Sequence, residues 1–578
     1  LLGRTYDLNR PPVVAVVLTG KPQPGVGPMD VALAMIAKTF KNGFNKNKIL
    51  EVLGPGVANL SMEYRMGIDV MTTESAALSS IWVTDDKTRI WLEKHGRPEE
   101  YHPMAPSGVT YYDSLIEIDL DTVECMMALP YHPSNALPIR EFKADPAKYL
   151  AAVEAEGNKI KGEHGQPFHI MDKLKDDGLH VDQALVSGCA GGMFENLSAM
   201  ADILDCCALP GNGPFLGINP ASQPVYLDAI RKGVADTLTL AGAVIRASMC
   251  GPCFGVSDIP ADNQLSIRHV TRNYPNREGS KPGNGQMAAA ILMDARSIAA
   301  TVRNGGVLTA ATELDVNYIE REHDFDPTIY QNQVYNNAGK PDETVKLRMG
   351  PNIASWPEMF PYAKHLLLRV AGAYEGSVTT DELVPSGDAT AYRSNPEKIS
   401  DYTMISRDPG YRARAKAVRA DATLVRSGKL PEDPAAACAV SKAVALLGCK
   451  PEELTYGSII TSDAIGDGSS REQAASNQKV LGGYANLACE YSTKRYRSNL
   501  INWGILPLLT AENPHLQVGD FVLIENVRDA IAADNTEITL HIWNDAGERV
   551  HTATLGGMTK EEKEILASGC LINYYRAE

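Results

Sequence analysis

Short apolar runs that alternate with helical patterns constrain the fold of this chain more than any other feature. Residues 13–18, Val-Val-Ala-Val-Val-Leu, are typical of a buried strand, and the turn pair Thr-Gly ends the run. Asp30 can cap a helix over residues 31–39, whose apolar positions are almost continuous. The alternation recurs at residues 184–186 and 196–204. It predicts an α/β architecture.

The length of the chain and the changes in its local composition predict several domains. A chain of 578 residues is too long for one hydrophobic core. The α/β pattern divides into residues 1–180 and residues 181–313, and the second part contains most of the cysteine and glycine motifs. Over residues 314–362 Asn, Asp, Pro and Tyr dominate, so we expect an ordered linker. Residues 363–578 resume the alternation, with strands predicted at 521–524 and 538–542, and should form a separate domain.

Charge and composition limit the partners of the chain. Its formal net charge of −16 argues against a nucleic-acid partner, for which a basic surface is expected. No run of eighteen apolar residues occurs, so we expect no membrane span, and residues 1–7 lack the features of a secretion signal. We therefore expect a cytoplasmic monomer whose ten cysteines are reduced. A close cysteine pair in such a protein is more often a metal or redox site than a disulfide.

Residues 250–253, Cys-Gly-Pro-Cys, form the sharpest local motif. The pair can be a thioredoxin-type redox pair, two ligands of an iron–sulfur cluster, or two buried thiols without a chemical role. A thioredoxin domain would need a compact βαβ context, and Met249 stands where an aromatic residue is usual. A third cysteine, Cys189, lies in a turn of small residues after a strand-like run, and glycine lets backbone approach a bulky group. Three thiolates favour a cluster with one open iron that acts as a Lewis acid.

Two further segments suggest anion binding. Arg272 and Arg277 lie in a loop that contains Pro and Gly, and such guanidinium forks bind carboxylates, although solvated surface arginines give the same pattern. Residues 466–475 are typical of a glycine turn that enters a helix, where Ser469 or Ser470 can form a capping box and where backbone N–H groups bind anions. Residues 283–288 match a dinucleotide fingerprint, but they follow a loop rather than a strand and do not predict that site.

Taken together, these motifs resemble those of the aconitase family, and the resemblance runs through nearly the whole chain. Six elements occur in the family's order: residues 12–33, Cys189 with Cys250 and Cys253, residues 272–277, residues 378–381, residues 468–471 and residues 497–504. Within the family, residues 276–282 and 392–396 are most similar to bacterial aconitase-like hydratases. The resemblance implies a three-layer α/β core that the linker joins to a swivelling C-terminal domain, with the active site between them.

The resemblance also implies a function and the residues that carry it. We expect a hydro-lyase that adds or removes water on a small hydroxy-polycarboxylate, with a [4Fe–4S] cluster bound by Cys189, Cys250 and Cys253. Ser469, as an alkoxide, is the implied base, and Asp69 and Asp381 are the other implied catalytic residues. The implied substrate-binding residues are Arg272, Arg277, Arg407, Ser470 and Arg471.

The chain departs from the family at several positions. The acidic residue of the family's Met-Gly-Ala-Glu motif corresponds to Asp69 in this chain, and Glu74 is the alternative. The family's Thr-Thr-Asp-His motif ends in Glu382 instead of His. An Asp-Ser-His-Thr motif and further active-site histidines would precede Leu1, so we expect a core that is incomplete at its N-terminus. The alternative substrates are isopropylmalate, homoaconitate and methylcitrate, and the alternative role is a non-catalytic iron sensor that contains the cluster.

Overall fold

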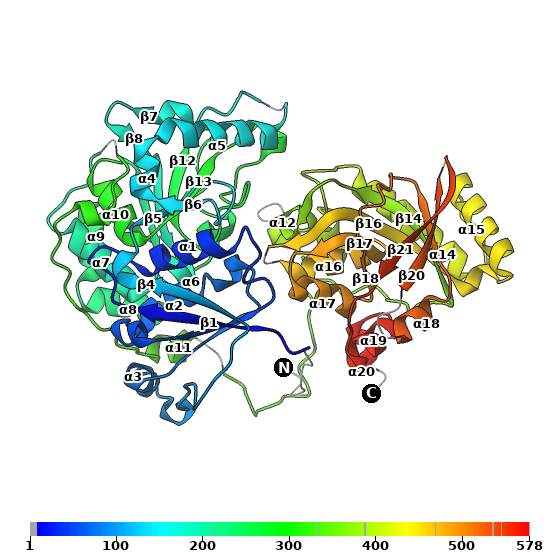
Figure 1. Cartoon of the computed structure of the whole chain (residues 1–578), viewed down its shortest axis with the longest axis horizontal. Coiled ribbons are helices and arrows are strands. Elements are labelled where there is room, and N and C mark those ends of the chain that lie inside the picture. Colours follow the sequence, from blue (N-terminus) through cyan, green and yellow to red (C-terminus); the bar gives the residue numbers. More distant parts are fainter. Residues whose placement is uncertain are drawn as a thin grey trace. The chain divides into compact units, whose positions relative to one another are not determined.

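A computed structural model describes residues 9–163, 165–211, 213–333, 336–385, 389–468, 470–533, 537–544 and 546–576. The chain divides into two compact units, here called the core unit (Pro11–Thr344) and the C-terminal unit (Val345–Glu578, to which the residues up to Arg10 also belong) (Figure 1). Both units combine helices with sheets that contain parallel strands, so the predicted α/β class is confirmed. The finer division at residues 180, 313 and 362 stays a prediction. No helix in the described part of the chain is both long and apolar enough to cross a membrane.

The first sheet of the core unit is parallel, with the strand order β3-β2-β1-β4. Its strands are β1 (Val13–Thr19), β2 (Ile49–Leu53), β3 (Ser79–Trp82) and β4 (Ser114–Asp119). Helices α1 (Pro28–Thr39) and α2 (Met62–Asp69) lie against one face. The strand and helix predicted over residues 13–39 are therefore confirmed. The helix begins earlier than expected, because Gly27 is its N-cap and Asp30 lies inside the first turn, where its carboxylate accepts from the Gly27 N–H (2.8 Å).

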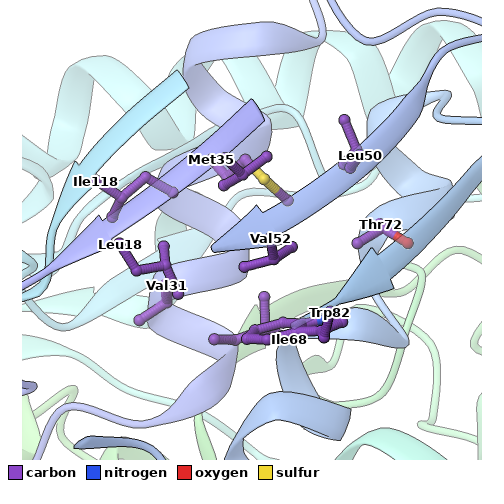
Figure 2. Close-up of a pocket in the computed structure, with 10 residues that line it drawn as sticks. Leu18, Val31, Met35, Leu50, Val52, Ile68, Thr72, Trp82 and Ile118 are labelled. Carbon is purple, nitrogen blue, oxygen red and sulfur yellow. The ribbon is translucent and has the colours of Figure 1, made fainter. Parts of the chain in front are cut away.

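A small apolar pocket lies between this sheet and the two helices (Figure 2). Its cavity volume is about 10 Å³. Side chains from the strands, from α1 and α2 and from nearby turns line it: Val16, Leu18, Val31, Met35, Leu50, Val52, Ile68, Thr72, Trp82 and Ile118. A cavity of this size holds about one water molecule. The functional site must therefore be sought elsewhere.

The second sheet of the core unit has the order β11-β10-β9-β12-β13-β5-β6. Its parallel strands are β9 (Gln183–Ser187), β10 (Phe215–Asn219), β11 (Val244–Ile245), β12 (Leu265–His269) and β13 (Ala289–Met293), and β5 (Met126–Ala128) and β6 (Ala136–Pro138) are antiparallel. The loops that follow β9, β11 and β12 carry Cys189, Cys250 and Arg272. The carboxyl ends of parallel strands share one edge, where ligands bind in open α/β sheets. This sheet therefore brings the candidate residues to one edge.

Glu63 of α2 joins the first sheet's helix layer to helix α7 (Phe194–Leu204), which follows the Cys189 turn. Its buried carboxylate accepts from the backbone N–H groups of Glu195 (2.6 Å) and Phe194 (3.3 Å). These groups belong to the first turn of α7, where helical N–H donors lack partners within the helix. The pKa of Glu63 is raised from 4.5 to about 7, mainly by burial; the charge of Glu195 acts in the same direction, and the two backbone N–H groups act against it.

The raised pKa of Glu63 predicts a pH dependence of stability. A carboxyl whose pKa is higher in the folded state than in the unfolded state stabilises the fold most at pH values below its unfolded-state pKa. This stabilisation is lost as the pH rises through its folded-state pKa. We expect the free energy of unfolding to decrease between pH 4.5 and about 7, by up to about 3 kcal/mol from this group. In Glu63→Gln this slope should shrink, and in the exposed control Glu99→Gln it should persist. Denaturant titrations at a series of pH values measure it, and an unchanged slope in Glu63→Gln would refute the assignment.

The sheet of the C-terminal unit has the order β14-β19-β20-β21-β18-β17-β16-β15, and β14 also pairs with β16, so the sheet closes on itself. The strands are β14 (His365–Ala373), β15 (Ser377–Thr379), β16 (Leu454–Asp467), β17 (Gly483–Tyr491), β18 (Leu506–Leu509), β19 (Phe521–Ile524), β20 (Glu537–Asn544) and β21 (Gly547–Thr554). The strands predicted at 521–524 and 538–542 are confirmed as β19 and β20. The main helices are α14 (Tyr411–Arg426), α15 (Pro434–Leu447), α16 (Arg471–Val480) and α17 (Lys494–Asn502).

The segment expected as a linker is attached to both units. Near its start, Arg321 binds Asp202 (2.8 Å) and His323 binds Asp228 (3.0 Å), both within the core unit. Near its end, Trp356 contacts Trp503 within the C-terminal unit, with 4.4 Å between ring centroids. Between these anchors, residues 336–349 are exposed throughout.

The exposed stretch is the expected site of limited proteolysis. Trypsin should cut first after Lys346 or Arg348, because exposed backbone without packed side chains opens readily. Arg321 should be cut later, since its side chain is held by Asp202. Mass spectrometry of early digests measures the order, and a double variant with Gln at the two sites is the control. First cleavage at Arg321, or scattered cleavage throughout the chain, would contradict the two-unit arrangement.

Candidate functional site

Cys189 lies in a tight turn directly after β9. The strand ends at Ser187, and a single helical turn, α6 (Gly188–Gly191), follows it. Gly188 has a φ of +67°, and a Cβ atom at this position would lie 3.3 Å from Sγ of Cys253. Glycine is favoured here by both the backbone angle and the close approach. The side chain of Cys189 is exposed, so a ligand can reach it.

Cys250 and Cys253 lie in a second loop, at the 3₁₀ turn Gly251–Phe254. The backbone N–H of Cys253 donates to the carbonyl of Cys250 (3.0 Å). The pKa of Cys253 is raised to about 11, mainly by burial, and the charges of Cys250 and Cys189 act in the same direction. Burial also raises the pKa of Cys189, with Cys250 as the next cause. The three thiols from two loops are therefore close enough to repel one another when ionised.

These thiols suit a positively charged, sulfur-binding group. A metal centre would offset the repulsion between the thiolates, and thiolates are the usual ligands of iron–sulfur clusters. Within the described residues, no three His, Cys, Asp or Glu side chains are gathered tightly enough to bind one metal ion. Thiolates that bind separate irons of a cluster need not meet at one point. Three cysteine thiols are a donor set that fits such a cluster.

Arg268 fixes the second cysteine loop and is not among the residues expected from the sequence. It is 1% exposed in β12, and its Nη1 donates to the carbonyl of Pro252 (2.8 Å). Its Nε donates to Oγ of Ser266 (2.9 Å). Burial lowers the pKa of Arg268 to about 10, and Glu278 partly opposes this effect. An arginine that alternates with Leu265, Ile267 and Val270 is the signal that could have identified it, because such a residue is buried only with partners.

Arg272 and Arg277 lie beside the three thiols. The charge of Arg272 acts to lower the pKa of Cys189, and that of Arg277 acts to lower the pKa of Cys253, against the larger effect of burial. Asn273 fixes the loop, because its Nδ2 donates to three carbonyls, those of Ala128, Leu129 and Ala290. The structure thus brings the expected arginine loop to the expected cysteines.

Glu74, rather than Asp69, contacts the arginine loop. Oε1 of Glu74 lies 2.6 Å from Nη2 of Arg272, and Oε2 accepts from Nε of Arg272 (3.0 Å). The hydroxyl of Tyr274 also donates to Oε2 of Glu74 (3.2 Å). Asp69 instead accepts from Oγ of Ser80 (2.5 Å) and Nε1 of Trp82 (2.8 Å). The rival acid Glu74 is therefore the one that the fold places at the site of the arginines and thiols.

The C-terminal unit gathers a second group of candidate residues. Gly468 has a φ of +122°, and a Cβ atom there would lie 2.0 Å from Oγ1 of Thr380, so only glycine fits. This contact brings the turn before α16 to the start of α12 (Thr380–Leu383), where Asp381 lies. Arg471 opens α16, and Ser470 is its N-cap residue without a side-chain capping bond. The expected base, Ser469, lies outside the described residues.

Arg407 is bound by groups of the C-terminal unit itself. Its Nη1 donates to the carbonyl of Ser377 (2.8 Å) and lies 3.1 Å from Oε1 of Glu382. Its Nη2 donates to the carbonyl of Glu375 (2.6 Å). The guanidinium also lies over the ring of Tyr374, 5.1 Å from its centroid. These contacts fix Arg407 at the end of β15, beside α12.

Comparison with known families matches both parts of the chain. Residues 1–300 match the model of the aconitase family (aconitate hydratase), and residues 453–513 match the aconitase C-terminal domain. The first match covers more than half of the 578 residues. The two matched segments include the cysteine and arginine loops and the Ser470–Arg471 turn.

Curated relatives are similar at low identity. The mitochondrial aconitate hydratase of Saccharomyces cerevisiae is 24% identical over all of this chain and 72% of its own length. The mitochondrial homocitrate dehydratase of the same yeast is 24% identical over 99% of this chain and 72% of its own length. The 3-isopropylmalate dehydratase large subunit 2 of Rubrobacter xylanophilus is 29% identical over 50% of this chain, and the match spans 60% of that protein.

Proposed function

The chain belongs to the aconitase family of hydro-lyases, and we propose that it reversibly adds and removes water on a small hydroxy-polycarboxylate. The observation that carries the proposal is the meeting of three thiols and two arginines at one edge of the second core sheet. Relatives named as aconitate hydratase, homocitrate dehydratase and 3-isopropylmalate dehydratase support the reaction class. They differ in substrate, so the substrate has to be argued from the site.

Cys189, Cys250 and Cys253 are the proposed ligands of a [4Fe–4S] cluster. Their proximity, the small residues around Cys189 and the hydrogen bond from Arg268 to the second loop support this assignment. When bound, such a cluster supplies a Lewis acid that polarises a substrate hydroxyl and carboxylate. Arg272 and Arg277 add positive charge beside the thiolates and so limit the cost of holding three negative sulfurs together.

Residues of the C-terminal unit are proposed to bind substrate and move its proton. Ser469 would take the proton from the carbon next to a substrate carboxylate, and Asp381 would assist at the adjoining turn. The guanidinium of Arg471 would bind a carboxylate, with Ser470 contributing its hydroxyl. The glycine contact between Gly468 and Thr380 supports a single preorganised group, because it fixes the turn against α12.

Two residues of the core unit are proposed for further roles, one as the acid of the site and one in binding a substrate carboxylate. Glu74 is the better candidate than Asp69 for the acid of the site, because it contacts Arg272 while Asp69 binds Ser80 and Trp82. Arg277 is proposed to bind a substrate carboxylate. A cytoplasmic location and a monomeric state stay predictions from the sequence.

Turnover of candidate acids tests the proposal. The full chain, loaded anaerobically with iron and sulfide, should convert at least one of citrate, isocitrate, homocitrate, 2-methylcitrate, malate or 3-isopropylmalate to an unsaturated acid, measured by ultraviolet absorbance. The reaction should stop when iron is removed and resume when it is restored. A fully loaded protein that dehydrates none of them, and hydrates none of the matching unsaturated acids, would contradict the proposed function.

A further inference from the structure

Three buried serine hydroxyls lie close to the proposed cluster ligands and make no hydrogen bond: those of Ser187, Ser248 and Ser257. In the part of the chain that the structure describes, they are the only serines with a buried, unpartnered hydroxyl. Each lies two to four residues along the chain from one of the three thiols. A buried hydroxyl in a native protein is expected to bind a protein group, a water molecule or a cofactor. Three such hydroxyls around one set of thiols point to a common partner.

Ser187 ends β9, two residues before Cys189. Its side chain is 1% exposed. Gly188 separates the two residues, and a Cβ atom on it would lie 3.3 Å from Sγ of Cys253, so the end of β9 closely approaches the second cysteine loop. The Ser187 hydroxyl acts to lower the pKa of Cys253, against the larger effect of burial. A donor that stabilises a thiolate has this effect.

Ser257 approaches the second cysteine loop at another glycine. A Cβ atom on Gly251, the residue after Cys250, would lie 2.5 Å from Oγ of Ser257. The Val256 N–H donates to the Gly251 carbonyl (3.0 Å), and this bond folds the segment back onto the loop. A larger residue at position 251 would displace the hydroxyl. The Ser257 hydroxyl therefore packs against the backbone between Cys250 and Cys253.

Ser248 lies in the same loop, two residues before Cys250. The backbone before it is fixed from a neighbouring strand. Asn219 is fully buried at the end of β10, and its Nδ2 donates to the carbonyl of Ala247 (3.0 Å). The loop therefore holds the buried hydroxyl of Ser248 near the cysteines through a defined backbone contact.

From this arrangement we infer that the hydroxyls of Ser187, Ser248 and Ser257 donate hydrogen bonds to the sulfur atoms of the bound cluster and raise its reduction potential. The inference rests on the proposed cluster and assigns three residues outside its ligand set. Cluster sulfurs carry negative charge, and hydrogen bonds to them are among the factors that set the potential. Reduction adds a further negative charge, so donors stabilise the reduced form more than the oxidised form. The serines would tune the cluster without binding iron.

A redox titration of the loaded full chain tests the inference without any turnover. The one-electron reduction of the cluster is followed by electron paramagnetic resonance. In the triple variant Ser187→Ala, Ser248→Ala, Ser257→Ala, the ratio of reduced to oxidised cluster at a fixed potential should fall by about tenfold or more. This change equals a midpoint about 59 mV more negative. Each single variant should shift the midpoint less, in the same direction.

Ser198→Ala is the matched control. Ser198 is also a buried serine of the core unit, but its hydroxyl has a partner, because it accepts from Nη1 of Arg321 (2.8 Å). Its loss should leave the midpoint unchanged. A shift in Ser198→Ala as large as that of the triple variant would overturn the inference, because any loss of a buried hydroxyl would then act on the potential.

The remaining outcomes also decide the inference. Alanine variants that contain a full cluster and keep the wild-type midpoint would overturn it. If the variants take up no cluster, proton resonances of the reduced wild-type cluster in light and heavy water decide instead, and the absence of exchangeable protons coupled to the cluster would overturn it. A wild-type protein that takes up no cluster would refute the cluster assignment and the inference together. Shifted midpoints in a protein that dehydrates no hydroxy-acid would refute the proposed reaction and leave the inference standing.

Discussion

Replacing Cys250 with serine is expected to remove most of the iron from the protein and to abolish turnover. The same result is expected for Cys189→Ser and Cys253→Ser, because a serine hydroxyl is a hard, weakly acidic ligand where the cluster needs a soft thiolate. Wild-type protein prepared anaerobically should be brown and contain about four irons per chain. Iron and sulfide analysis of each variant, together with the visible absorbance spectrum, measures the effect.

Two exposed cysteines outside the three-thiol group provide controls. Cys206 lies in the core unit after α7, and Cys438 lies in α15 of the C-terminal unit. Cys206→Ser and Cys438→Ser should retain full iron and full turnover. If all three variants at positions 189, 250 and 253 kept their iron, the cluster assignment would be wrong.

Replacing Ser469 with alanine is expected to lower kcat by at least about 100-fold with little change in fold, because the group that accepts the substrate proton would be lost. Were Ser469 only a helix cap, the change would cost about 1 kcal/mol of stability and leave turnover nearly intact. Steady-state kinetics and thermal unfolding of the same preparation separate the two effects. A variant that melts earlier but turns over normally would exclude Ser469 as the base.

Variants of the two residues after Ser469 help to separate loss of the base from loss of substrate binding. Ser470→Ala is the matched control, since Ser470 is the N-cap residue of α16 and its side chain makes no capping bond. It should raise KM more than it lowers kcat. Arg471→Lys should also act mainly on KM, because an ammonium group cannot reproduce a bidentate guanidinium fork.

The local pattern predicted most of the elements that position the site. The apolar run at 13–18 and the run at 521–524 became β1 and β19, because a short β-branched run bounded by turn residues has few other structures open to it. The Cys189 turn and the arginine loop lie close enough for the charge of Arg272 to act on Cys189. Both follow the carboxyl ends of neighbouring parallel strands, β9 and β12, which share an edge.

The features that the sequence did not predict depend on contacts between residues that are far apart in the chain. The pairing of Glu74 with Arg272 joins residues 198 positions apart, and the closing of the C-terminal sheet requires β14 to pair with β16. Arg268 is a charged residue in a buried strand, whose role becomes visible only through the Pro252 carbonyl that it binds. The residue type of Asp30 predicted a helix N-cap. In the structure Asp30 lies inside the first turn of α1, where it is buried near Asp294 and accepts a hydrogen bond from the Met126 N–H. Such contacts are set by tertiary packing, which no local window contains.

Isotope incorporation tests the central claim most directly. The cluster-loaded full chain would be incubated with an unsaturated di- or tricarboxylic acid in water labelled with deuterium and oxygen-18, and the products would be analysed by NMR and mass spectrometry. Addition of water predicts a product with one labelled hydroxyl and one deuterium on the adjacent carbon, formed by wild-type protein and absent with Cys250→Ser. A wild-type protein with a full cluster that incorporates neither label, or a Cys250→Ser protein that incorporates both at the wild-type rate, would contradict the account.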